Sequence, residues 1–150
     1  MKKMLAMTIA TGALLLPLGH LATTSIASAA PTSAAVRADW YKAVARLRGQ
    51  TLASGKGVYR DRERRAGVEQ RLAIEIEDAE PNWVYEVHFN GTLLGEITTD
   101  EFGTGELNLK TARFIDDPEE WQPLPENFPR VIEGDSLTVG PVSGNFRVRS

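Results

Sequence analysis

The chain has 150 residues, a formal charge of −3 at pH 7 and no cysteine. The lack of cysteine excludes disulfide bonds and thiolate metal sites. A net acidic chain is also a poor candidate for general nucleic-acid binding, because neutralisation of phosphates by cations supplies most of that affinity.

The first 29 residues have the anatomy of a secretory signal peptide. A basic MKK start precedes an apolar stretch, and the ASA sequence at 27–29 matches the small-x-small cleavage pattern. An uncleaved membrane anchor is the alternative, but Pro17 and Gly19 interrupt the roughly 20 apolar residues that a span needs. We therefore expect cleavage before Ala30 and a periplasmic or extracellular protein with no transmembrane segment in the mature chain.

Residues 30–35 are small and polar, which predicts a flexible leader. Residues 36–49 predict a short helix, because apolar residues recur there at helical spacing and a glycine closes the segment. These residues are Val36, Trp40, Val44, Leu47 and Gly49. Such a helix would pack its apolar stripe on the following domain or on a partner.

From residue 50 to residue 150 the pattern changes to period two and predicts one β domain. In the first clear strand the apolar side chains share one face, and they are Val68, Leu72, Ile74 and Ile76. Glu69, Arg71, Glu75 and Glu77 fall mostly on the other face. The next strand places Trp83, Tyr85, Val87 and Phe89 on one side, which predicts an aromatic core.

Two turn signals follow in succession. Asn90-Gly91 favours a type I′ hairpin turn, because both residues tolerate positive φ. The sequence from Asp100 to Gly103 predicts a second turn, and residues 104–109 the strand after it. Residues 83–109 therefore predict a three-stranded meander whose carboxylates lie on turns or on the solvent face.

A proline-rich segment, 111–134, here called the flap, interrupts the strands because its four prolines cannot contribute to long ladders. Phe114, Trp121 and Phe128 could pack it down. Two short closing strands follow. About seven strands in total predict an antiparallel sandwich, with a partly closed barrel as the alternative.

Residues 84–109 carry a phrase that resembles transthyretin-like and carboxypeptidase-regulatory-like β-sandwich modules, and small all-β domains of exported bacterial proteins. The matching positions are Gly95, Thr98 or Thr99, Asp100, Gly103 and Leu107. They cover about a fifth of the mature chain. The resemblance implies a seven-stranded accessory, binding or structural module, and it transfers no catalytic residues.

No catalytic residue is predicted. After cleavage the one histidine is His88, between Val87 and Phe89 on a strand, and nothing singles out an acid pair for glycoside hydrolysis. The chain is therefore predicted not to be an enzyme, with a small hydrolase as a remote alternative.

No cofactor is predicted, apart from calcium as an alternative. Asp100, Asp116 and Asp117 supply the hard oxygen ligands that calcium prefers, although the spacing matches no known calcium loop. The same acidic segment equally suits a solvated loop.

The hairpin KGVYRDRERRAGVEQR is the sharpest charge feature. Arg60, Arg62, Arg64 and Arg65 could bind an anionic partner such as lipopolysaccharide, an acidic glycan or the acidic face of a protein. Self-association with the acidic half of a second copy is another reading. The favoured alternative is an arginine-rich sheet edge that discourages aggregation.

The sequence thus predicts an exported, non-enzymatic module of the bacterial cell envelope, either structural or binding an envelope component or another protein. The second hypothesis is a calcium- or carbohydrate-dependent adhesion module that uses the Asp100 turn and the flap. In that case Trp40, Tyr41 and Trp121 would offer a stacking platform for sugars.

Overall fold

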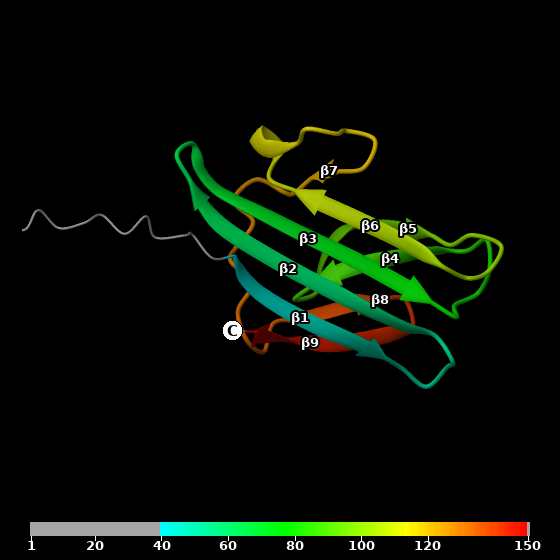
Figure 1. The fold of residues 1–150 in the computed structure, drawn as a ribbon. Coiled ribbons are helices and arrows are strands. Elements are labelled where there is room, and N and C mark those ends of the chain that lie inside the picture. Colours follow the sequence, from blue (N-terminus) through cyan, green and yellow to red (C-terminus); the bar gives the residue numbers. More distant parts are fainter. Residues whose placement is uncertain (1–39, 150) are drawn as a thin grey trace, which may run out of the picture. The chain divides into compact units, whose positions relative to one another are not determined.

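A computed structural model describes residues 40–149, and they form one curled β-sheet (Figure 1). The nine strands lie in the order β5-β4-β8-β9-β1-β2-β3-β6-β7, and every neighbouring pair is antiparallel except β6–β7. The strands are β1 (Tyr41–Arg48), β2 (Ser54–Arg64), β3 (Gly67–Glu77), β4 (Val84–Phe89), β5 (Thr92–Thr98), β6 (Gly105–Lys110), β7 (Gln122–Pro123), β8 (Ser136–Val139) and β9 (Val142–Arg149).

The predicted all-β class is confirmed, but the predicted count of seven strands is too low. The strands form a single sheet curled into a half-barrel, and not the two-layer sandwich that was the first expectation. This arrangement is nearer to the alternative prediction, a partly closed barrel. The signal peptide expected at 1–29, the leader at 30–35 and the first residues of the expected helix, 36–39, lie outside the described residues. In the part that is described, no helix is long and apolar enough to cross a membrane.

The helix predicted over 36–49 is wrong in its described part, because Tyr41–Arg48 forms strand β1. Strand β1 lies between β9 and β2, at the middle of the sheet. Its alternate residues Ala43, Ala45 and Leu47 are fully buried. Two of these three inward residues are alanines, which give only a weak hydrophobic signal. The alternation of a strand was therefore hard to recognise in the sequence of this segment.

The core lies on the concave side of the sheet. Alternate residues of each strand point to this side, because successive side chains of a strand face opposite ways. Its largest fully buried members are Leu47, Tyr59, Leu72, Ile74, Ile76, Ile97, Leu109, Leu137 and Phe146. Trp83 departs from the predicted core face of β4, since 53% of its surface is exposed.

The two predicted turns form as expected. Asn90 and Gly91 have φ angles of 48° and 80° and join β4 to β5. In the second turn the Asp100 Oδ1 accepts hydrogen bonds from the backbone N–H groups of Phe102 and Thr104, both at 2.9 Å. Gly103 has a φ of 76°, and a Cβ there would lie 2.1 Å from a backbone oxygen, so glycine is required.

The third strand of the predicted meander pairs elsewhere. Strand β6 forms its ladder with β3, with Leu109 opposite Leu72, and no ladder joins it to β5. The two strands still pack closely across the curled sheet, since a Cβ at Gly105 would lie 2.5 Å from a methyl group of Ile97. The sequence could locate β6 but not its partner.

The flap covers one opening of the half-barrel. It begins with a 3₁₀ turn at Ala112–Phe114 and contributes the short strand β7. Leu124, Phe128 and Val131 are buried, and the Phe128 ring lies 5.1 Å from that of Phe89. These contacts anchor a segment that has little regular structure.

Candidate anion-binding face

The outward sides of β9, β1, β2, β3 and β6, here called the convex face, carry one cation each in register. This cationic row consists of Arg149, Lys42, Arg60, Arg71 and Lys110, in that strand order. Neighbouring strands lie about 4.8 Å apart, so the row extends roughly 19 Å across the sheet. The row crosses the strands nearly at right angles and is invisible as a run in the sequence.

Like charges that lie directly opposite one another destabilise an antiparallel pair. The cationic row contains four such pairs, and Arg46 opposite Lys56 makes another on the same face. Cross-strand pairs are typically worth about 0.2–1 kcal/mol each. This arrangement therefore opposes folding unless counter-charges or a ligand offset the repulsion.

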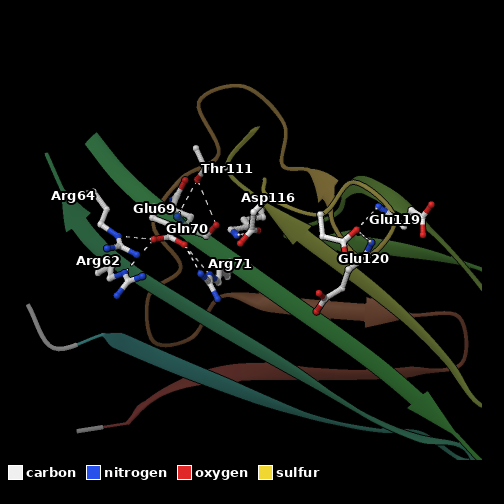
Figure 2. A network of polar contacts seen from close by, with 11 residues as sticks. Arg62, Arg64, Glu69, Gln70, Arg71, Thr111, Asp116, Glu119 and Glu120 are labelled. Atoms are coloured by element: carbon white, nitrogen blue, oxygen red, sulfur yellow. Dashed lines mark hydrogen bonds and ion pairs between the residues drawn. The ribbon is translucent and has the colours of Figure 1, made fainter. Parts of the chain in front are cut away.

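Counter-charge is supplied at β2 and β3 by Glu69, around which three arginines converge (Figure 2). Oε2 of Glu69 lies 2.8 Å from Nε of Arg64 and 3.1 Å from Nε of Arg62, while Oε1 accepts two hydrogen bonds from Arg71. Only 2% of the Glu69 side chain is exposed, contrary to the predicted solvent face. Burial alone would raise the pKa of Glu69, but the arginine hydrogen bonds and charges outweigh it and lower the pKa.

Two tryptophans flank this cluster. The guanidinium carbon of Arg62 lies 4.0 Å from the ring centroid of Trp40, and that of Arg71 lies 4.9 Å away. From the flap, the Trp121 ring faces Arg71 at 5.7 Å and the Lys110 ammonium at 5.6 Å. Cations over tryptophan faces are attracted by the ring quadrupole, so both aromatic rings help to hold the cations in place.

Lys110, at the β6 end of the row, is also compensated. Its ammonium donates a hydrogen bond to Asp116 of the flap, and this bond lowers the pKa of the Asp116 carboxyl group. The lysine is 2% exposed, because the flap covers it. The β3–β6 part of the row is therefore neutralised within the chain.

The β9–β1–β2 part of the row has no such compensation. Within residues 40–149, no ion pair joins Arg149, Lys42 or Arg60 to a carboxylate, and the same holds for Arg46 and Arg147 beside them. A shallow depression in this area is lined by Val44, Arg46, Asn145, Arg147 and Arg149. Five cations therefore lie close together here without a carboxylate partner among the described residues.

A groove of about 310 Å³ crosses the border between the two parts. Apart from Ile74, its strand residues form three cross-strand rows on β2, β3 and β6, with Trp121 beside them. Arg60 and Arg71 form the first row, Val58, Ala73 and Asn108 the second, and Lys56, Glu75 and Glu106 the third. The groove thus has a cationic end, an apolar floor, an aromatic wall and a far end where two carboxylates accept hydrogen bonds beside the Lys56 ammonium.

Among the four predicted anion-binding arginines, Arg60 alone lies on the uncompensated part of the row. Arg62 and Arg64 bind Glu69, and Arg65 lies in the turn between β2 and β3. The alternative of an arginine-rich sheet edge is wrong. Strand β2 is flanked by β1 and β3, whereas β5 and β7 are the edges.

The basic side chains of β1 and β9 were not among the residues predicted to bind an anion. They alternate along their strands, as K-x-V-x-R-x-R at 42–48 and R-x-R at 147–149. An alternating basic pattern on a strand would have indicated a charged face. On a helix, which was the prediction for 36–49, the same residues would not share one face, so the pattern indicates a charged face only once β1 is known to be a strand.

The three predicted calcium ligands have separate internal roles. Asp100 closes its own turn, Asp116 pairs with Lys110, and the Asp117 Oδ1 accepts hydrogen bonds from the N–H groups of Glu119 and Glu120. Over residues 40–149 no three histidine, aspartate or glutamate side chains are grouped so that they could hold a metal ion. The structure therefore does not bring these ligands together.

His88 and a hollow under the flap are weaker candidates for a functional site. His88 lies on β4, with its Nε2 3.5 Å from a carboxylate oxygen of Glu86. The hollow, of about 550 Å³, is lined by Gln70 and by residues 124–128 among others, but the Gln70 amide already binds Tyr59 and the carbonyl of Phe128. The Arg113 guanidinium, which also lines the hollow, likewise donates to the backbone carbonyl of Ala66.

Comparison with known proteins adds no assignment. No protein-family model matches the chain, and a search of curated proteins found no match. The function must therefore be inferred from the geometry and charge of the convex face.

Proposed function

We propose that this chain is an exported, non-enzymatic module of the bacterial cell envelope that binds an anionic partner through its convex face. The observation that carries the proposal is the cationic row, whose uncompensated members Arg149, Lys42 and Arg60 lie opposite one another at the middle of the sheet. A ligand with negative charge would offset a repulsion that the fold itself leaves in place.

The location of the row also supports binding rather than protection of an edge. Charged residues that prevent aggregation are expected on edge strands, where backbone groups are unpaired. Strands β1 and β2 have neighbours on both sides and need no such protection. The resemblance of 84–109 to accessory β modules agrees with a role that does not involve catalysis.

The charge distribution of the chain favours a selective interaction. The formal charge of the whole chain is −3, so the cations are concentrated against the overall balance. Local positive potential raises the rate of encounter with anions and orients them, even when the net charge is negative. The acidic flap and turns would repel the same ligand elsewhere on the molecule.

The test compares binding of the purified chain to sodium polygalacturonate and to polyphosphate, before and after loss of two facing cations. The double variant Lys42→Gln/Arg60→Gln should bind about tenfold more weakly, which corresponds to 1.4 kcal/mol. Its dependence on salt should also be shallower, because fewer counterions are released.

The matched control is Arg65→Gln/Arg113→Gln, which removes the same charge near the β2–β3 turn. This control should keep the affinity of the parent. Equal losses in both double variants would show that only net charge matters and would refute the convex face as the site. Sedimentation of the parent without ligand tests self-association, which would appear as a dimer that dissociates at high salt.

A further inference from the structure

The groove beside the cationic row combines groups that a simple anion does not need. Arg60 and Arg71 lie at one end, while Trp121 forms a wall over an apolar floor. At the other end Glu75 lies opposite Glu106 in the ladder between β3 and β6. An anion alone would use the arginines and leave the remaining groups without a role.

We infer that this groove binds a sugar unit of an acidic glycan, an inference that rests on the proposed function and names the class of the partner. The carboxylate or phosphate substituent of the sugar bonds to the Arg60 guanidinium group, beside Arg71, which Glu69 already holds in place. The ring lies on the floor formed by Val58 and Ala73, against the Trp121 indole. Aromatic rings supply large apolar contact area at low entropic cost.

The residues toward the far end of the groove are suited to bind the hydroxyl groups of a sugar. Ionised carboxylates such as Glu75 and Glu106 only accept hydrogen bonds, and the Asn108 amide both donates and accepts. Glu75 and Glu106 lie about 13 Å along the strands from the arginine end, and Asn108 lies about half as far, at 3.2–3.4 Å per residue. A volume of about 310 Å³ lies at the small end of ligand sites, which suits one or two rings.

Other polyanions fit this groove less well. Single-stranded DNA carries its charge on the backbone and offers few hydroxyl groups from which the carboxylates of Glu75 and Glu106 could accept hydrogen bonds. A membrane surface is broad, whereas the groove lies on a convex face between the strands and Trp121. The glycan instead continues from Arg60 past Lys42 to Arg149, across the strands and along the cationic row.

The experiment measures dissociation constants for the purified chain, for two groove variants, Trp121→Ala and Asn108→Ala, and for the row variant Arg60→Gln, with Arg65→Gln as the control. The probes are oligogalacturonate, neutral dextran, polyphosphate, single-stranded DNA and vesicles containing phosphatidylglycerol. We expect the parent to prefer oligogalacturonate over polyphosphate and DNA of equal charge, and not to bind dextran. Each groove variant should bind oligogalacturonate about tenfold more weakly, with polyphosphate binding unchanged.

The outcomes separate this inference from the proposed function. If DNA or vesicles bind as tightly as oligogalacturonate, or if both groove variants bind it like the parent, the glycan assignment is overturned and the anion-binding face stands. If Arg60→Gln leaves every polyanion affinity unchanged, both proposals fail. Asn108→Ala keeps the test valid if loss of Trp121 loosens the flap, because Asn108 lies on strand β6.

Discussion

Nε of Arg130 lies 2.8 Å from Oδ2 of Asp61, and this ion pair ties the flap to strand β2. The arginine is largely exposed, whereas only 8% of the aspartate side chain is accessible. Asp61 also accepts a hydrogen bond from the buried Tyr59 hydroxyl, whose pKa is raised by burial. The Arg130 guanidinium covers the ring of Tyr41 at 3.9 Å. The flap is thus held by a polar clamp as well as by Phe128.

Removal of Arg130 should loosen the flap. Arg130→Ala leaves the Asp61 carboxylate buried without its cation, and a lost hydrogen bond to a charged group costs about 1.5–3 kcal/mol. Urea denaturation should show this loss, with faster hydrogen exchange at 124–131. The double variant Asp61→Asn/Arg130→Ala should recover part of it, whereas strictly additive effects would show that the two side chains are not coupled.

The Glu69 cluster predicts a dependence of stability on pH. Because the folded state lowers the pKa of Glu69 below its ordinary value of 4.5, its stabilisation is present above that value and is lost as pH falls through the folded pKa. Glu69→Gln should destabilise the chain by about 1–3 kcal/mol at pH 7, and the difference from the parent should shrink below pH 4.5.

The control for this measurement is Glu75→Gln, which removes an exposed carboxylate that lies 3.8 Å from Lys56. Exposed ion pairs contribute about 0–1 kcal/mol, so the control should change stability little at any pH. A stability gap for Glu69→Gln that stays constant down to pH 3 would contradict the assignment of the pH dependence to this carboxylate.

Replacement of Arg60 should stabilise the fold and weaken the binding of anions. It lies opposite both Lys42 and Arg71, so Arg60→Gln removes two like-charge contacts and should stabilise the fold by about 0.2–1 kcal/mol at low salt. Screening should reduce the gain at 1 M salt, where the Debye length is about 3 Å. A loss of stability at low salt in thermal unfolding would show that the row is already compensated.

Calcium should have no effect on the described domain. A ligand that binds only the folded state raises its stability, by about 2.7 kcal/mol at a hundredfold excess over Kd. Since Asp100, Asp116 and Asp117 are engaged separately, millimolar calcium after chelation should leave the melting temperature unchanged. Asp100→Ala should lower it equally with and without calcium, because the lost hydrogen bonds are those of the turn. A calcium-dependent rise would restore the adhesion hypothesis.

The local features of the fold were predictable because their signals are local. Asn90 and Gly91 adopt the positive φ that their hairpin needs, and Asp100 and Gly103 form the expected turn. The alternation of Leu72 with charged neighbours located β3 before any partner strand was known. Such signals depend on backbone dihedrals and on side-chain period, which a single segment carries by itself.

The burial of Glu69 could not be predicted from its local sequence. Its place in the alternation predicted a solvent face, but Arg62 and Arg64 come from β2 and reach over it. The same limit applies to β1, where pairing with β2 and β9 selected a strand over a helix. Pairing energy comes from residues far apart in the chain, and no short window contains it.

The sequence by itself determined the all-β class, most of the turns, the cysteine-free chemistry and the basic character of the β2–β3 hairpin. Only the tertiary structure decided which of those arginines are neutralised inside the molecule and which face outward. Lys42 and Arg149 are more than one hundred positions apart, yet they lie directly opposite each other. The register between β1 and β9 sets this juxtaposition, because a shift of one residue would turn either cation toward the core.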